Sequence, residues 1–431
     1  MRQLFFYILL LYVTSVSAQM MQDTTAFPNL RNKIKDQDFF IKNNPSNPKP
    51  YMRRAECKFE LNDFKGSLED YTRAIELDPK SDLVYSKRSN VKFTVGDYVG
   101  AISDLDEAIR LNPHDITHYY NRGRAYYKLN DYTNVVRDFT IFVNGTDPKA
   151  YAAFKLPSVY SCIGEAKLNL GEFEEAITYF NKSLELAPSR SGDYYMRGHA
   201  RWELQDYEGA ITDDSWALKL DSTIVDAYND RGLSRYNLKK YPEGLQDLNA
   251  AIRLDSTYIR AYNNRGLIYT ELKKYKEAER DFRKLITAQP DSALGYCALG
   301  NLRSIENNYK EALSWYEEAL KRNSRDFSSW YGKAYVYYKS GDLTQALNDY
   351  NKSIELNKTN AGAWYYRGLV KLDMKQYEEA LSDFNSAIQI NPYGVDAYRG
   401  RARAYEKLNK PQQAAADEKR AKLIEKQYGK P

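Results

Sequence analysis

Residues 259–292 read IRAYNNRGLIYTELKKYKEAERDFRKLITAQPDS. Counted from Ile259 as position 1, Tyr262, Gly266 and Tyr269 occupy positions 4, 8 and 11, and this spacing places them on one face of a helix. Positions 17, 20, 24 and 27 form a second stripe with the same spacing: Tyr275, Ala278, Phe282 and Leu285. Pro290, at position 32, ends the second helix because proline lacks an N–H group and disfavours helix in the residue before it. The stretch therefore predicts two antiparallel helices joined by a short turn around residues 273–274.

The same 34-residue pattern recurs between about residue 48 and residue 428. Eleven copies begin near residues 48, 82, 116, 157, 191, 225, 259, 293, 327, 361 and 395. Position 8 faces position 24 across each hairpin, so a small residue lies opposite a large one and the two helices can approach closely. Glycine occupies position 8 in seven copies: Gly123, Gly164, Gly198, Gly232, Gly266, Gly300 and Gly368. Alanine occupies position 20 in eight copies: Ala101, Ala176, Ala210, Ala278, Ala312, Ala346, Ala380 and Ala414.

This pattern resembles the tetratricopeptide repeat, a 34-residue helix–turn–helix unit. The resemblance implies an all-α fold: a right-handed α-solenoid of about eleven repeats, with a capping helix at each end. It also implies that function lies in a concave groove where the family binds partner proteins or peptides. Chaperone-binding members of the family hold a C-terminal carboxylate with Lys and Asn at positions 5, 6 and 9, and here Asn121 with Arg124 is the only partial match.

Positions 7 and 23 carry opposite charges in nine copies and lose both charges together in the other two. The pairs are Arg54–Asp70, Arg88–Asp104, Arg122–Asp138, Arg197–Asp213, Arg231–Asp247, Arg265–Asp281, Lys333–Asp349, Arg367–Asp383 and Arg401–Asp417. The two exceptions have Ile163 with Tyr179 and Leu299 with Trp315. Because these positions lie nearly level across the hairpin, we predict a partly buried ion pair in each of the nine repeats. Losing both charges together avoids leaving one of them buried alone. The alternative, a basic stripe that binds an anionic ligand, is disfavoured by the paired aspartates.

Domain boundaries follow from the register of the repeats. Residues 1–18 read as a signal peptide, with Arg2, a short apolar run and small residues before a cleavage point between Ala18 and Gln19. Residues 19–47 are a polar segment that contains a capping helix at about residues 29–43. Residues 48–149 hold repeats one to three, residues 150–156 an insertion that we expect to disturb the stacking, and residues 157–428 repeats four to eleven. The sequence therefore predicts an exported protein that is periplasmic, associated with the cell envelope or secreted, without a transmembrane segment in the mature chain.

No motif for catalysis, a cofactor or a metal stands out in the sequence. There are three histidines, and no Cys, Asp or Glu pattern around His114 and His118 indicates a metal site. The sequence contains no Gly-rich phosphate loop, nucleophile elbow or metalloprotease helix. A net charge of +5 on a 50.0 kDa chain is too small to favour nucleic acid as a partner. We therefore expect neither an enzyme nor a cofactor. Cys57, Cys162 and Cys297 fall in repeats one, four and eight and are interpreted as packing residues.

Positions 2, 5, 9 and 12 of the first helices form the face where a partner would bind. The candidate residues are Tyr120, Asn121, Arg124, Tyr127, Tyr195, His199, Trp202, Asn229, Asn263, Tyr331, Tyr335, Tyr338 and Tyr365. Aromatic side chains beside Arg are typical of binding hot spots, although tyrosines could equally fill the inner wall of a tightly wound solenoid. Asn264 extends the asparagine group, which could bond an extended peptide backbone. Two hypotheses remain: a scaffold that binds partner proteins or extended peptides in the groove, and a spacer or self-assembling element that acts through its ends.

Overall fold

The computed structural model describes residues 26–146 and 156–428. Within those residues it contains 23 helices and no strand, and this confirms the predicted all-α fold built from helical hairpins. The chain forms two compact units, residues 1–220 and residues 221–431, and each is described by itself. Among the described helices, none combines the length and apolar character needed to cross a bilayer. The predicted signal peptide, its cleavage point at Ala18–Gln19 and residues 150–155 of the predicted insertion lie outside the described residues.

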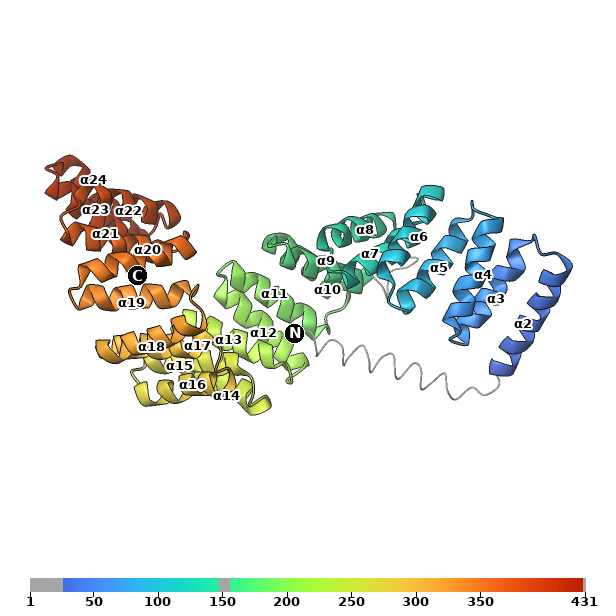
Figure 1. Ribbon diagram of the computed structural model, residues 1–431, viewed down its shortest axis with the longest axis horizontal. Helices are drawn as coiled ribbons and strands as arrows, with labels where there is room; N and C mark the ends of the chain where they lie inside the picture. The colour runs from blue at the N-terminus through green and yellow to red at the C-terminus, as the bar shows by residue number, and fades with distance from the viewer. Residues whose placement is uncertain (1–25, 147–155, 429–431) are drawn as a thin grey trace. The chain divides into compact units, whose positions relative to one another are not determined.

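Unit 1 contains a single helix followed by five hairpins (Figure 1). The single helix is α2 (Ala26–Asn43). The hairpins are α3 (Pro48–Glu60) with α4 (Phe64–Leu77), α5 (Asp82–Thr94) with α6 (Tyr98–Leu111), α7 (Ile116–Lys128) with α8 (Tyr132–Gly145), α9 (Leu156–Asn169) with α10 (Phe173–Leu186), and α11 (Ser191–Glu203) with α12 (Tyr207–Leu220). Each helix packs against the next one along the chain, so the hairpins of this unit stack in sequence order.

Unit 2 contains six hairpins (Figure 1). They are α13 (Val225–Asn237) with α14 (Tyr241–Leu254), α15 (Ile259–Glu271) with α16 (Tyr275–Ala288), α17 (Ala293–Ile305) with α18 (Tyr309–Arg322), α19 (Phe327–Lys339) with α20 (Leu343–Leu356), α21 (Ala361–Asp373) with α22 (Tyr377–Ile390), and α23 (Val395–Lys407) with α24 (Pro411–Tyr428). In both units the first helices of neighbouring hairpins also pack against one another, as α13 does with α15 and α17 with α19. The first helices of unit 2 therefore form an inner layer within that unit, with direct contacts from α13 to α15 and from α17 through α19 and α21 to α23.

A left-handed residue ends the first helix of every repeat. In the repeat quoted above, Lys273 has a φ of 56°. Its N–H donates to the carbonyl of Thr270 at 2.9 Å, and the N–H of Lys274 donates to the carbonyl of Tyr269 at 2.8 Å. These are the two bonds of a Schellman cap, which closes the helix and reverses the chain. The equivalent residue has positive φ in all eleven repeats: Asn62, Gly96, Asn130, Gly171, Gln205, Lys239, Lys273, Asn307, Gly341, Lys375 and Asn409.

Close contact between the two helices explains the small residue at position 8. A Cβ atom placed on Gly266 would lie 2.4 Å from a ring carbon of Phe282, so any larger residue would displace the ring. Phe282 is 2% exposed and Ala278 is fully buried, so the interior of the hairpin has no room for such a shift. The core of each unit is thus a row of small clusters, each shared between adjacent helices.

Stacking continues across the insertion of unit 1. Val135 and Phe139 of α8 belong to the same buried cluster as Val159 and Ile163 of α9. Helix α9 begins at Leu156, which is itself only 6% exposed and joins that cluster. The expected disturbance of the stacking is therefore not seen in the described helices on either side.

The two terminal helices cover the apolar sides of the end repeats. Helix α2 packs against α3, and Ile41 packs on the first core cluster. Asp38 on α2 accepts a hydrogen bond from Arg54 at 2.7 Å, so α2 takes the place of a second helix from a preceding repeat. At the other end, Ala421 and Ile424 of α24 are buried against α23.

Candidate functional site

All nine pairs at positions 7 and 23 form ion pairs in the structure. In eight of them the arginine is bidentate: Arg265, for example, donates from Nε to Asp281 Oδ2 at 2.8 Å and from Nη2 to Oδ1 at 2.7 Å. The other seven arginine pairs have the same two bonds. The ninth pair is weaker, because Lys333 Nζ lies 3.3 Å from Asp349 Oδ2. Burial raises the pKa of Asp349, which this single lysine offsets only in part.

Most of these arginines also bond the preceding repeat, which the sequence analysis missed. The Nη1 atom of Arg265 donates to Asn249 Oδ1 at 2.6 Å, and Asn249 lies at position 25 of the preceding second helix. The same contact joins Arg88 to Thr72, Arg122 to Asp106, Arg197 to Asn181, Arg367 to Asn351 and Arg401 to Asn385. The guanidinium groups are therefore fully occupied in packing, so they do not form a basic surface for a ligand.

The two repeats without the pair replace it by apolar contacts. Ile163 is fully buried and shares a cluster with Tyr179, and Leu299 is fully buried and shares one with Trp315. An apolar pair of similar volume can take the place of a buried ion pair at little cost.

The predicted residues of repeat three lie together in unit 1, but mostly as packing residues. The Tyr120 ring lies 4.9 Å from the Phe142 ring, and the Tyr127 hydroxyl donates to Glu165 Oε2 at 2.6 Å. Burial and the Glu165 carboxylate both raise the pKa of Tyr127. These two tyrosines thus fill the space between α7, α8 and α9.

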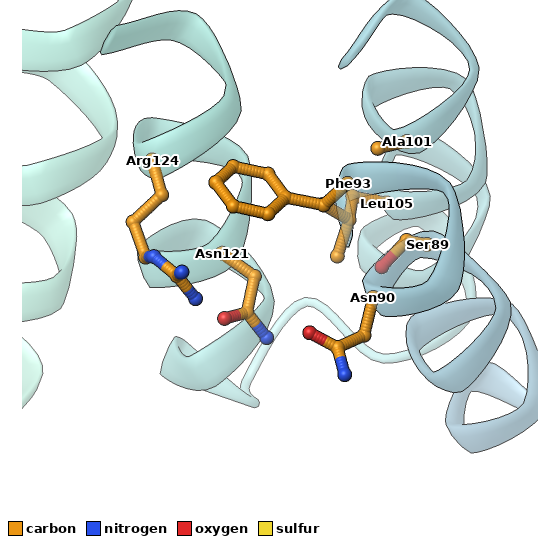
Figure 2. A pocket seen from close by; sticks show the side chains of 7 residues that line it. All are labelled: Ser89, Asn90, Phe93, Ala101, Leu105, Asn121 and Arg124. Carbon is orange, nitrogen blue, oxygen red and sulfur yellow. The ribbon is translucent and has the colours of Figure 1, made fainter. Parts of the chain in front are cut away.

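Asn121 and Arg124 line a small recess between α5 and α7 (Figure 2). The Arg124 guanidinium lies 4.5 Å from the centre of the Phe93 ring. Figure 2 shows the polar ends of Asn90, Asn121 and Arg124 on one side of this ring. The recess itself measures about 10 Å³, room for about one water molecule, so it does not form a site for a larger ligand as it stands.

Tyr195, His199 and Trp202 lie along α11. The His199 and Trp202 rings stack with centres 6.4 Å apart, and His199 Nε2 lies 3.8 Å from Glu203. None of the three lines the recess between α5 and α7 or the groove of unit 2. All three side chains are partly buried, the Trp202 Nε1 atom fully so, and their role in binding stays a prediction.

A groove of about 780 Å³ opens on the inner layer of unit 2. It spans α13 to α21, and most of its lining residues belong to repeats seven, eight and nine. Its lining includes Asn263, Leu267 and Thr270 from α15; Leu294, Cys297, Asn301, Ser304 and Ile305 from α17; and Ser328, Tyr331 and Tyr335 from α19. This volume falls within the range of about 300–1,000 Å³ that is usual for ligand sites. Three of the predicted residues, Asn263, Tyr331 and Tyr335, therefore line one cavity.

The groove combines exposed apolar side chains with fixed amides. Leu294 is 46% exposed and Ile305 is 52% exposed. The Tyr316 hydroxyl donates to Asn301 Oδ1 at 2.7 Å and fixes the amide, whose NH2 group makes only a long contact of 3.9 Å to Cys297 Sγ and can still donate to a ligand in the groove. Among the described residues of the lining, the only carboxylates are Glu271 and Asp326, and there is no Lys or Arg.

Asn229 is a correction to the sequence prediction. It is fully buried, and its side chain bonds Asp230 at 2.8 Å and Asn264 at 2.9 Å. Asn229 therefore joins α13 to α15 and cannot reach a peptide in the groove. Asn263 donates to Asn264 at 3.3 Å and is the member of this group that lines the cavity.

The tyrosines of repeats nine and ten gather around Tyr366, a residue that the sequence analysis did not select. Tyr335 lies 5.3 Å from the Tyr366 ring and Tyr365 lies 5.0 Å from it. Tyr338 lies 6.4 Å from Tyr366 and donates from its hydroxyl to Asp373 at 3.0 Å; burial raises its pKa to about 12. Tyr338 and Tyr365 are thus packing residues, whereas Tyr331, Tyr335 and Tyr366 also face the groove.

Repeat eight contributes the residues that sequence reasoning overlooked. Leu294, Cys297, Asn301 and Ile305 occupy positions 2, 5, 9 and 13 of α17. The sequence signal was the smaller residues at positions 5 and 9, where Cys297 and Asn301 stand in place of the tyrosines Tyr331 and Tyr335 of the next repeat. Burial raises the pKa of the Cys297 thiol to about 11, so the thiol is neutral at physiological pH.

Family models match most of the repeat region. Models described as tetratricopeptide repeat match residues 48–81, 157–190, 195–259, 259–292 and 365–428, and one described as TPR repeat matches residues 90–130. A model described as anaphase-promoting complex, cyclosome, subunit 3 matches residues 306–387. A search of curated proteins finds no match.

Two solved structures share the fold. Yeast Tom70 is 18% identical with a TM-score of 0.53, over 96% of this chain and 92% of that one. A tetratricopeptide repeat protein from Parabacteroides merdae is 19% identical with a TM-score of 0.52, over 58% of this chain and 99% of that one. At these identities the similarity shows the fold and does not by itself identify a partner.

Proposed function

Because the chain belongs to the tetratricopeptide repeat family, we propose that it is a non-catalytic scaffold that binds an extended segment of a partner protein in the groove of unit 2. The observation that carries this proposal is the groove itself, which is lined by positions 2, 5, 9 and 12 of three consecutive first helices. These positions take no part in the ion pairs, and apart from Cys297, which is buried in a core cluster, they lie at the edges of the cores. They are therefore free to differ between repeats, and recognition requires such differences.

Exposed apolar side chains supply the affinity in this proposal. Leu294 and Ile305 lie at opposite ends of α17, at positions 2 and 13, and both are about half exposed. Complete burial of an aliphatic side chain of this size is worth about 1.5–3 kcal/mol, so burying the exposed half of each contributes about 1 kcal/mol. Tyr331 and Tyr335 add aromatic surface on the next helix, and their packing around Tyr366 holds them in place before a partner binds.

Amide groups supply the contacts that an extended backbone needs. An extended segment presents N–H and C=O groups that must be bonded once water is removed. Asn301 and Asn263 lie on neighbouring first helices, and both are held by side-chain hydrogen bonds, from Tyr316 to Asn301 and from Asn263 to Asn264. Fixed amides lose little entropy on binding, which favours this contact.

The charge of the lining favours a segment with a basic residue over a free C-terminus. Glu271 and Asp326 are the carboxylates of the described lining, and no cation there could hold a terminal carboxylate. The carboxylate-binding pattern implied by part of the family is therefore not repeated in unit 2. We propose instead an internal segment that carries Lys or Arg between apolar residues.

We further propose that the protein acts outside the cytoplasm, in the periplasm or cell envelope or after secretion, because residues 1–18 have the pattern of a signal peptide. N-terminal sequencing of the protein recovered from its native source tests this. A mature chain that begins at Gln19 is expected, and recovery of the intact residues 1–18 in the functional protein would contradict the proposal.

Substitutions of exposed groove residues test the binding site. A phage-displayed library of random peptides is selected on the full chain, and the affinity of the selected peptides is measured by fluorescence anisotropy. Leu294→Asp is expected to weaken binding at least tenfold, because it places a charge where an apolar side chain is buried. Leu254→Asp is the matched control: Leu254 is 49% exposed but lies at the end of α14, outside the groove lining.

The outcomes separate the scaffold from the spacer. Loss of binding in Leu294→Asp with retention in Leu254→Asp supports the groove. Equal affinity in both variants would refute it and favour a spacer that acts through its ends, for which removal of α2 is the change that matters. Circular dichroism melting of both variants controls for folding, since both substitutions are at exposed positions.

A further inference from the structure

Three side chains of the types that bind metal ions meet between repeats two and three of unit 1. Asp82 is the first residue of α5, Asp115 is the residue that caps α7, and His118 lies in the first turn of α7. His118 Nε2 lies 3.1 Å from Asp82 Oδ2 and 3.7 Å from Asp115 Oδ2, and all three atoms lie within 4.8 Å of one another. Two carboxylate oxygens and an imidazole nitrogen therefore converge from two different repeats.

These separations suit a common metal ion. Ligand atoms that bind one zinc ion at about 2.0–2.2 Å in tetrahedral geometry lie about 3.2–3.6 Å from one another. The two distances from the His118 nitrogen bracket this range. The third separation, between the Asp82 and Asp115 carboxylates, is bounded only at 4.8 Å, so these two side chains would close on each other when one cation contacts all three atoms.

Hydrogen bonds within this cluster do not pair both carboxylates with His118. His118 Nε2 can donate one hydrogen bond, and Asp82 receives it, whereas the 3.7 Å distance to Asp115 Oδ2 is too long for a second. His118 is only 2% exposed, so its imidazole is shielded from water; a cation on Nε2 would leave the ring proton on Nδ1, which has no acceptor in the described part of the chain. A divalent cation at Nε2 would contact both carboxylates at once and offset their two negative charges.

Neighbouring polar groups already hold the carboxylates in position. The Asn112 side chain donates to Asp82 Oδ2 at 3.0 Å. Thr117 donates to Asp115 Oδ1 from its backbone N–H at 2.9 Å and from its hydroxyl at 2.6 Å, which leaves Oδ2 turned toward His118. Partners of this kind orient the first ligands of a metal site.

Both His118 and Asp82 differ from the residues that occupy the same positions in most other repeats. Position 3 is fully buried and small or apolar in most repeats, as at Val84 and Ala261, but it is histidine in repeat three. Position 1 is acidic only at Asp82 among the eleven repeats. The two departures occur in adjacent repeats and contact each other, 36 residues apart, so the fold and not local spacing brings them together.

We propose that Asp82, Asp115 and His118 bind one zinc-type divalent cation that joins the first helices of repeats two and three. The imidazole nitrogen favours a transition metal over Mg²⁺ or Ca²⁺. The side chain of Asp82 is 28% exposed and that of Asp115 is 36% exposed. A fourth coordination position of the cation would therefore be open to water or to a ligand from a partner. The proposal is independent of the groove in unit 2.

Calorimetry on the full chain tests the site directly. Any histidine tag is removed, the protein is treated with EDTA and dialysed, and zinc chloride is titrated by isothermal calorimetry. One zinc per chain is expected, together with a rise in the melting temperature measured by circular dichroism. Cobalt substitution gives a second readout, because Co²⁺ bound by one nitrogen and two oxygens has visible d–d absorption.

Three variants decide between a built site and surface binding. Asp115→Asn retains an N-cap side chain for Thr117 but loses the charge, so it should fold and bind zinc at least tenfold more weakly. His118→Ala should abolish binding, and Asp82→Asn supports the same conclusion if the buried His118→Ala variant fails to fold. His114→Ala is the matched control: His114 is exposed, lies beside Asp115, and should leave binding unchanged.

The proposal is overturned by any of three results: no stoichiometric binding by the full chain, binding that survives Asp115→Asn and Asp82→Asn, or binding that is lost in His114→Ala alone. The last result would show an ordinary surface histidine as the ligand.

Discussion

Removing the same arginine from two repeats should have very different consequences, because the aspartates that would be left behind have different neighbours. Arg265 and Arg367 each make a bidentate pair, with Asp281 and Asp383. Asp383 also has Lys371 at 2.8 Å, whereas the residue equivalent to Lys371 in repeat seven is Tyr269. The substitution Arg265→Leu therefore strands a buried carboxylate, and Arg367→Leu does not.

The magnitude follows from burial. The Asp281 side chain is 3% exposed, and breaking a buried pair by removing one partner costs about 3–5 kcal/mol. Asp383 is 2% exposed but keeps a counter-charge in the second variant, so we expect about 1 kcal/mol for the lost hydrogen bonds. The pair of variants should thus differ by about 2 kcal/mol or more although the deleted side chains are identical. Leu is used because repeat eight itself carries Leu299 at this position.

Hydrogen exchange measured by mass spectrometry is the appropriate assay, because repeat proteins open locally and a single global free energy is poorly defined. A loss of 3 kcal/mol corresponds to an increase of about 100-fold in exchange through local opening, expected in peptides from α15 and α16. Arg367→Leu should accelerate exchange in α21 and α22 by about fivefold.

The double variant Arg265→Leu with Asp281→Leu completes the test. Removing both charges should recover most of the loss and leave the repeat within about 1.5 kcal/mol of the native chain. Asp281→Leu alone should cost less than Arg265→Leu, because the arginine side chain is 17% exposed and can turn its head toward water. Equal costs for Arg265→Leu and Arg367→Leu, or additive costs in the double variant, would refute the reasoning.

Three further predictions concern single residues. Lys333→Arg should restore a bidentate contact with Asp349 and stabilise the protein by about 0.5–1.5 kcal/mol. Burial raises the pKa of Asp349 in the native chain. The contribution of Asp349 to the free energy of unfolding therefore falls as pH rises from the ordinary Asp pKa of about 3.9 through the raised value, because its carboxylate becomes charged while buried. The stabilisation by Lys333→Arg, measured in thermal melts, should thus be larger at pH 7 than at pH 4. Cys297, with its pKa raised to about 11, should react with iodoacetamide at pH 8 on the order of 100-fold more slowly in the folded chain than after denaturation; equal rates would show that its thiol is not buried as described. Lys273→Gly should raise the melting temperature, because a lysine with φ of 56° costs about 1 kcal/mol relative to a residue without Cβ, and an unchanged or lower value would contradict this.

The fold was predictable because its constraints repeat with the sequence. Gly266 must face Phe282 in one hairpin, and a small residue opposite a ring or a leucine recurs in most of the others, so repetition strengthens a weak local signal. The ion pairs were predictable for the same reason, since positions 7 and 23 change together within a single chain. The left-handed turn was harder to see, because Lys273 and Gln205 occupy a backbone conformation that usually selects glycine or asparagine.

The contact of each arginine with the preceding repeat escaped notice although a signal existed. Position 25 holds a side chain with an acceptor oxygen in these repeats, among them Thr72, Asn249 and Asn385. Hairpin geometry relates positions within one repeat by simple spacing. Packing between repeats depends on how one hairpin rotates on the next, and the sequence alone does not give that angle.

The sequence named a binding face as a set of positions, and its role in binding stays a prediction; only some of the named residues line the groove. Whether a side chain at position 5 faces the groove depends on its neighbour in the next first helix. Asn229, at position 5 of repeat six, is covered by Asn264 of repeat seven. Tyr331, at position 5 of repeat nine, lines the cavity instead. A residue at position 5 can therefore either face a partner or hold two repeats together. Which of these it does depends on the side chain at position 6 of the following repeat. Exchanging Asn264 for alanine should therefore expose Asn229 and extend the groove to this residue. A selected peptide that binds this variant with unchanged affinity and footprint would show that the neighbouring side chain does not control whether position 5 faces the groove.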